Sequence, residues 1–267
     1  MRKNLTHRVI ACVLAVAALF AFSAAMADSL TYEGAWYGSY YGSYVVHDAT
    51  DAPISSNTAV EAGAFTMYDN TGALPLPLPD PRAGNPPRSF AAYCVDIRDW
   101  LQTTHLYNEQ TGTAFYIAHP YMATDLGRLA SYVYDNSTTA LTKASWGAAN
   151  VQSAAFQIAV WEIVNDANPG LLNGHGTAYN VTSGDFYVTS SYSAATNLAN
   201  TWLGIVNTGT YTIDRVPYVW DNACVDGAAG CTQSLVAFAV PEPETYAMLI
   251  AGLGLMGLIA RRKRGKA

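Results

Sequence analysis

The sequence predicts an α+β fold, a β-sandwich or barrel-like body with a helical insertion. Short segments rich in Tyr, Val and Thr, bounded by Gly, Pro and Asn turns, lie at both ends of the body, whereas helical periodicity is confined to its middle. Apolar residues make up 51% of the 267 residues and charged residues only 13%. The chain is therefore long and apolar enough to bury a sizeable core.

The first 27 residues have the three parts of a secretory signal peptide. An apolar run covers residues 9–22 and follows three basic residues, Arg2, Lys3 and Arg8. Ala25 and Ala27 place small side chains at the two positions that signal peptidase requires, so we expect cleavage before Asp28. A retained anchor helix is the weaker alternative, because the apolar run is short.

Strands are expected on both sides of the helical middle, because β-branched and aromatic residues there alternate between turn signals. The expected ranges are 32–46, 58–68, 89–97 and 114–119 before the middle, and 211–220 and 234–240 after it. Residues 74–81, with the sequence LPLPLPDP, predict an extended surface loop.

Three segments of the middle predict helices. The first is expected to begin with Thr124 as its N-cap, and its apolar residues share one face, at Leu126, Leu129, Ala130 and Val133. The second is expected after Asn150 and runs to about residue 165, before the Asn-Pro-Gly sequence at 168–170. The third is expected over about 193–206.

The body of the chain is acidic. Residues 28–240 contain six basic and 18 acidic side chains, so their net charge is near −12. Such a surface repels nucleic acid phosphates and suits an exported protein, and we expect no nucleic acid partner.

The cysteine count leaves one thiol without an obvious structural role. Cys12 lies in the signal peptide, and Cys224 and Cys231 bracket a short Gly-rich turn where a local disulfide is plausible. Cys94 is then an odd cysteine in an oxidising compartment, which indicates an intermolecular bridge or special chemistry. Burial as an inert thiol is the alternative.

Gln157 is the one uncharged amide near the middle of an otherwise apolar segment, residues 154–163. A buried Gln is costly unless its polar atoms are satisfied. We hypothesise that the Cys94 thiol and the Gln157 carboxamide condense, with loss of ammonia, into an internal thioester. The simpler interpretation is a core helix whose Gln hydrogen-bonds a neighbouring backbone.

Two short motifs resemble the thioester domain of bacterial surface adhesins. One is Tyr93-Cys94-Val95-Asp96, and the other, residues 156–162 with the sequence FQIAVWE, is similar to a Thr-Gln-x-Ala motif that leads into an apolar residue and Trp. Gln157, Ala159 and Trp161 match this motif, and Phe156 replaces the threonine. Gln152 is a second, less well matched candidate.

The resemblance implies that an amine, typically a lysine of another protein, attacks the thioester and becomes covalently tethered once per molecule. The protein would then have no turnover activity, and we expect no cofactor. Tyr93, Phe156 and Trp161 are expected to shield the bond from water, while Asp96 either positions the amine or is simply solvated. A single lysine within residues 28–240, Lys143, is consistent with an amine-reactive protein.

The C-terminus resembles the PEP-CTERM sorting signal. Its parts are Pro241-Glu242-Pro243, an apolar run over 245–260 that predicts a short membrane helix, and a basic cluster beginning with Arg261 and Arg262. The resemblance implies processing by an exosortase and delivery to the cell surface or extracellular matrix of a Gram-negative bacterium. An ordinary membrane anchor is the alternative. The chain thus divides into 1–27, 28–240 and 241–267.

Two other functions compete with the thioester. A thiol enzyme would use Cys94 as nucleophile and a histidine as base, the candidates being His105, His119 and His175. These histidines are scattered, without the paired spacing of a metal site. A passive structural protein of an exopolysaccharide or biofilm matrix, with Cys94 and Gln157 as core residues, is the main alternative.

Overall fold

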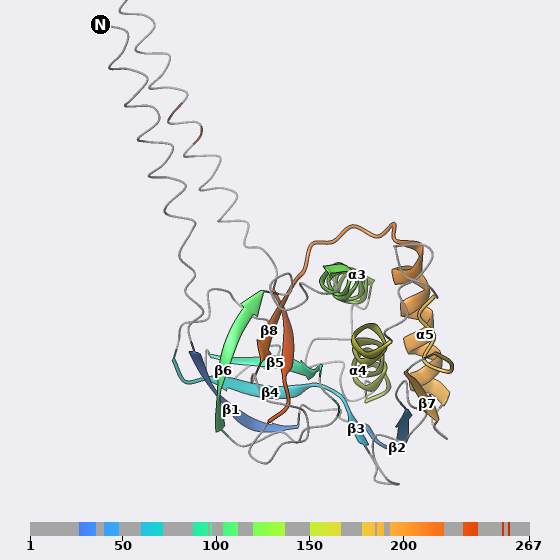
Figure 1. Ribbon diagram of the computed structural model, residues 1–267, viewed down its shortest axis with the longest axis horizontal. Coiled ribbons are helices and arrows are strands. Elements are labelled where there is room, and N and C mark those ends of the chain that lie inside the picture. The colour runs from blue at the N-terminus through green and yellow to red at the C-terminus, as the bar shows by residue number, and fades with distance from the viewer. Residues whose placement is uncertain are drawn as a thin grey trace, which may run out of the picture.

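Six antiparallel strands pair into a closed barrel (Figure 1). In barrel order they are β1 (Ala27–Ala35), β4 (Phe65–Asp69), β5 (Ser89–Cys94), β9 (Leu235–Ala239), β8 (Val216–Asp221) and β6 (Thr104–Thr111). The computed structural model describes residues 27–35, 40–47, 60–71, 88–95, 97, 104–111, 120–136, 150–166, 178–184, 186–189, 193–221, 232–239, 253 and 256. Closure pairs β1 with β6, and β8 and β9 complete the ring between β6 and β5, so strands from before and after the helices share one barrel.

A smaller sheet has the strand order β3 (Val60–Ala62), β2 (Tyr40–His47) and β7 (Tyr187–Thr189). The single strand predicted over 58–68 was wrong, because the chain leaves this sheet after β3 and enters the barrel at β4. The Ala64 N–H at the crossing donates to Ser153 Oγ at 3.0 Å instead of to a strand. Residues 60–69 therefore belong to one sheet and then to the other, and Ser153 of the second helix in the middle of the chain is bonded where the chain crosses between them.

Three helices lie together on one side of the barrel (Figure 1). They are α3 (Pro120–Asn136), α4 (Asn150–Asn165) and α5 (Ser193–Thr208), and they fall between β6 and β8 in the chain. Every residue of α4 from 153 to 163 is buried. This helix is apolar nearly all round because it packs against the barrel strand β5 as well as against α3 and α5. The predicted mixed fold with an inserted helical part is confirmed, in its barrel form.

The structure corrects two predicted boundaries. α3 begins at Pro120 rather than at Thr124, because a proline has no N–H to lose in the first turn and its fixed φ suits that position. β8 begins at Val216 rather than at Tyr211. Ser131 Oγ on α3 accepts hydrogen bonds from the N–H groups of Asp214 (2.9 Å) and Arg215 (3.1 Å), so this stretch crosses α3 before it joins the barrel.

β6 was not predicted, and the strand predicted over 114–119 lies outside the described residues. In the part of the chain that the structure describes, no helix has the length and apolarity needed to cross a membrane. The membrane helix predicted over 245–260 falls outside that part, except for Leu253 and Met256.

Candidate functional site

Cys94 is the last residue of β5, and its thiol faces the inside of the barrel. Tyr93 lies opposite Val236 and Cys94 opposite Leu235 in the ladder between β5 and β9. Successive side chains of a strand point to opposite faces. The Tyr93 ring packs on Phe156 of α4, outside the barrel, with 4.6 Å between ring centroids. The Cys94 side chain, 1% exposed, therefore points away from α4.

Gln157 reaches the backbone of Cys94 from α4. Its Nε2 donates to the Cys94 carbonyl oxygen at 2.7 Å, and its Oε1 accepts from the Cys94 N–H at 3.0 Å. Gln157 is fully buried, and these two bonds satisfy a donor and an acceptor on each side. This is the arrangement expected of a core helix whose Gln binds a neighbouring backbone. The structure thus brings Cys94 and Gln157 together, but not through the sulfur.

The sulfur of Cys94 instead contacts a glutamine that the sequence analysis had not considered. Cys94 Sγ donates to Gln233 Oε1 at 2.6 Å. Gln233 lies two residues before Leu235, so strand periodicity places it on the same face as Leu235 and Cys94. The Val95 N–H donates to the Ser234 carbonyl oxygen at 3.0 Å, which fixes the register beside it. Cys94 is buried while Gln233 is partly exposed.

Two hydroxyl groups lie near this contact. The Tyr107 hydroxyl of β6 lies 3.4 Å from Thr232 Oγ1, next to Gln233 in the chain, and both residues are buried. Burial raises the pKa of Tyr107 to about 12; the Thr232 hydrogen bond opposes this rise, and negative charge on Cys94 adds to it. Tyr107 is therefore a neutral phenol at physiological pH, close enough to Cys94 to sense its charge.

Tyr93 and Phe156, which were expected to shield the bond from water, lie in an aromatic cluster on the other face of β5. Phe156 packs against Tyr93 and, edge-on, against Phe238 at 5.5 Å and Trp202 at 6.4 Å between ring centroids. Trp161 is buried further along α4. Because Tyr93 and Cys94 alternate, this cluster holds α4 on the barrel rather than covering the thiol. Burial raises the pKa of Tyr93 well above its ordinary value.

Several predicted site residues lie outside the described residues. They are Asp96, the disulfide candidates Cys224 and Cys231, the bases His119 and His175, and the sorting residues Pro241, Glu242, Pro243, Arg261 and Arg262. Gln152, the second glutamine candidate, lies on α4 five residues before Gln157 and is partly exposed.

One sequence signal could have indicated Gln233. Thr232-Gln233 is the single Thr-Gln pair in the chain, whereas Phe156 stands before Gln157. The pair precedes β9 and lies 139 residues from Cys94 along the chain, so nothing local in the sequence connects Gln233 to Cys94.

A comparison with known protein families finds one match. Residues 239–264 match the PEP-CTERM protein-sorting motif. The predicted sorting signal is thereby confirmed, and the motif implies export, processing by an exosortase and a cell-surface or extracellular destination in Gram-negative bacteria. Neither a curated protein nor a solved structure is detectably similar to this chain.

Proposed function

We propose that this exported protein forms an internal thioester between Cys94 and Gln233 and uses it to capture an amine covalently. The observation that carries the proposal is the 2.6 Å contact between the Cys94 sulfur and the Gln233 carboxamide oxygen, which puts the carboxamide carbon one bond beyond the contact. The Cys94–Gln157 pairing predicted from sequence is less favoured, because the Gln157 amide is engaged by the Cys94 backbone on the opposite side.

The chemistry requires no further reactant besides the amine. In the first step the sulfur bonds to the side-chain carbonyl carbon of Gln233, the carbon–nitrogen bond breaks, and the thiol proton leaves with the nitrogen as ammonia. In the second step an amine nitrogen bonds to that carbon, the carbon–sulfur bond breaks, and a proton from the amine restores the thiol. A thiolate leaves far more readily than an amide nitrogen, so the thioester is the activated form.

The surroundings of the two residues suit this use. Gln157 fixes the Cys94 backbone from one side, and the bond between Val95 and Ser234 fixes the Gln233 side of the ladder. The sulfur is buried, while Gln233 is partly exposed. An amine therefore has a route to the acyl carbon, and the leaving sulfur stays in a site from which water is excluded. The captured partner is an amine-bearing surface or matrix protein.

The intact mass of the purified, exported protein tests the proposal. We expect it to be lower than the sequence mass by one ammonia, and to rise by one methylamine on treatment with that amine. Peptide mapping is expected to place the methylamide on Gln233. The matched variant is Gln233→Glu, which keeps the size of the side chain but removes the amide. It is expected to show no loss of mass and to have a Cys94 thiol that can be alkylated.

The other outcomes separate the alternatives. A methylamide on Gln157 would reject the Gln233 pairing and keep covalent capture. A full sequence mass for the wild-type protein, together with an alkylatable Cys94 thiol, would reject the thioester. The passive matrix protein would then be the better interpretation, with Cys94 and Gln157 as parts of the core.

A further inference from the structure

The polarity of the barrel strands determines at which end of the barrel each functional segment lies. Every strand of the barrel is antiparallel to both of its neighbours, so alternate strands run in opposite directions. β4 and β5 separate β1 from β9 on one side, and β6 and β8 separate them on the other. β1 and β9 therefore run in opposite directions. The start of β1 and the end of β9 consequently lie at the same rim of the barrel, which we call the sorting rim.

Both segments that the sequence predicts to be processed are joined to the sorting rim. β1 begins at Ala27, where the expected signal peptide ends. β9 ends at Ala239, and the match to the PEP-CTERM motif begins at the same residue. The apolar run that is expected to enter the membrane begins at Thr245, so the tether between β9 and this run is residues 240–244. A chain of that length spans at most about 18 Å, which keeps the sorting rim near the membrane until the motif is processed.

The contact between Cys94 and Gln233 lies at the opposite rim, which we call the capture rim. β5 is antiparallel to β9 and ends at Cys94, whereas β9 begins at Leu235, two residues after Gln233. At about 3.3 Å per residue of strand, the chain from Gln233 to Ala239 covers roughly 20 Å. The Gln233 carboxamide is therefore separated from the sorting segment by the length of β9, and it is partly exposed.

The charge of the body opposes a tilt that would bring the capture rim down to the lipid. Residues 28–240 carry a net charge near −12, and the headgroups of anionic phospholipids are negative as well. Like charges repel the body from such a surface, whereas a cationic partner is attracted to the body from solution. The side chain of lysine is cationic at neutral pH and supplies the primary amine that the proposed reaction needs.

The position of the capture rim distinguishes two classes of amine. Phosphatidylethanolamine carries a primary amine in its headgroup, so the membrane to which the chain is attached is itself a source of amines. A macromolecule outside that membrane is the other source. Only an amine that reaches the far end of the barrel can meet the Gln233 carboxamide while the sorting rim is held at the membrane.

We propose that the capture rim faces away from the membrane while the sorting segment is attached, and that the captured amine belongs to a macromolecule that approaches from outside. This inference rests on the thioester proposed above and identifies the side from which its partner comes. Aminophospholipids of the same membrane are not captured. Capture also does not depend on removal of the sorting segment, because exosortase processing takes place at the other rim.

Reconstitution of the chain that keeps its sorting segment tests the inference. The vesicles contain phosphatidylcholine and phosphatidylethanolamine, amino-dextran is the macromolecular probe, and free lysine is a small amine that does not cross the bilayer. We expect the ratio of the amino-dextran rate to the lysine rate to be the same in vesicles as in detergent solution. Peptide mapping is expected to find both probes, but no phosphatidylethanolamine, on Gln233. Gln233→Glu should take up none of the amines.

Val216→Cys is the matched control at the sorting rim. Val216 begins β8, lies opposite Ala239 in the ladder between β8 and β9, and is 39% exposed. We expect maleimide-dextran to label Val216→Cys more slowly in vesicles than in detergent, because the bilayer lies next to this rim. Peptide mapping separates the new thiol from the native cysteines.

The outcomes separate this inference from the proposed function. A full sequence mass before any amine is added would reject the thioester, and the inference with it. When the thioester is present, a phosphatidylethanolamine adduct on Gln233 would overturn the inference alone. A lower ratio of amino-dextran to lysine rates in vesicles would also overturn it. Equal labelling of Val216→Cys in vesicles and detergent would do the same, because the sorting rim would then not lie at the membrane.

Discussion

Gln157 and Glu162 are both polar side chains that are buried on α4, but their polar atoms have different partners. Gln157, near the middle, pairs its amide with the backbone N–H and carbonyl of Cys94, and every group involved is neutral. Glu162, five residues later, has one oxygen on a backbone N–H and the other beside a second carboxyl group. The Gln157 amide does not titrate, whereas burial raises the pKa of the Glu162 carboxyl well above its ordinary value.

The difference shows that one helix can be attached to its neighbours through two kinds of contact, one that does not titrate and one that does. The barrel side of α4 presents backbone groups at the end of β5, which an amide matches without charge. The other end of α4 meets residues 178–184, the strap, whose Asn180 N–H donates to Glu162 Oε1 at 2.6 Å. The contribution of Gln157 to stability should therefore be independent of pH, whereas the contribution of Glu162 should be lost as the pH rises through its raised pKa.

Removing the amide is the largest expected perturbation. Gln157→Leu keeps the bulk of the side chain but takes away the partner of two buried backbone groups of Cys94. At roughly 1–3 kcal/mol for each buried group left unpaired, we expect a loss of about 2–6 kcal/mol in the free energy of unfolding. Urea denaturation at pH 6 and pH 8 measures it, and the loss should be the same at both.

Ser153→Ala is the graded control on the same helix. It removes one partner, that of the Ala64 N–H, and should cost about 1–3 kcal/mol. If Gln157→Leu cost no more than Ser153→Ala, apolar packing rather than the Gln157 amide would hold α4 to β5.

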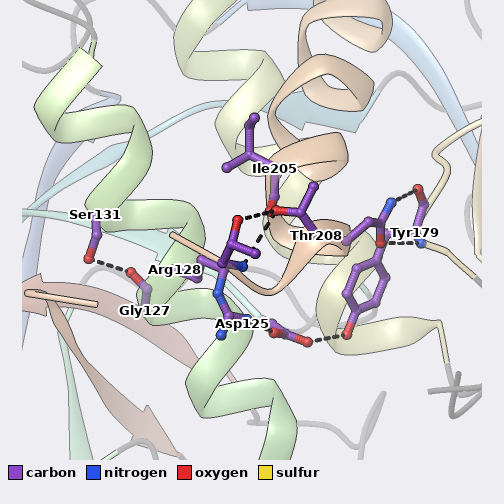
Figure 2. Close-up of polar contacts among 9 residues, drawn as sticks. Asp125, Gly127, Arg128, Ser131, Tyr179, Ile205 and Thr208 are labelled. Carbon is purple, nitrogen blue, oxygen red and sulfur yellow. Dashed lines mark hydrogen bonds and ion pairs between the residues drawn. The ribbon is translucent and has the colours of Figure 1, made fainter. Parts of the chain in front are cut away.

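On the strap side, Tyr179→Phe removes a buried hydrogen bond to the Asp125 carboxylate (Figure 2). Hydrogen bonds to charged groups contribute about 1.5–3 kcal/mol, so we expect a loss of that size in the free energy of unfolding. Tyr211→Phe is the matched control, since its hydroxyl donates to Asp135 at 2.9 Å on the exposed surface and should contribute less. Equal losses in both variants would show that burial does not strengthen the strap contact.

The smallest expected effect comes from replacing two helix glycines by alanine, which changes no polar side chain. Gly204 lies on α5 with no atom within 4 Å of an added Cβ, so Gly204→Ala should stabilise the protein by roughly 0.5–1 kcal/mol through helix propensity. Gly127 on α3 is its counterpart, because a Cβ there would lie 2.9 Å from the Arg215 carbonyl oxygen. Gly127→Ala should destabilise the protein, and thermal melts of the two variants should shift in opposite directions.

Helix α4 and helix α5 could be predicted from sequence because their long apolar segments have clear ends. β6 could not, since THLYNEQT has a polar composition and becomes a strand through pairing with β1 and β8. The break between β3 and β4 was also invisible locally. It depends on which of two sheets each half of the segment joins, and that choice is made by tertiary contacts.

For the candidate site, the sequence alone singled out Cys94 as an odd cysteine, Gln157 as a buried amide and residues 241–267 as a sorting segment, which the family comparison matches over residues 239–264. These signals are local and need no fold. Only the tertiary structure decided which glutamine meets the sulfur. Barrel closure places β9 beside β5, which brings Gln233 to Cys94 across 139 residues of chain, and strand alternation turns the sulfur away from α4. Side-chain direction in a paired strand depends on register, and register is set by partners far away in the sequence.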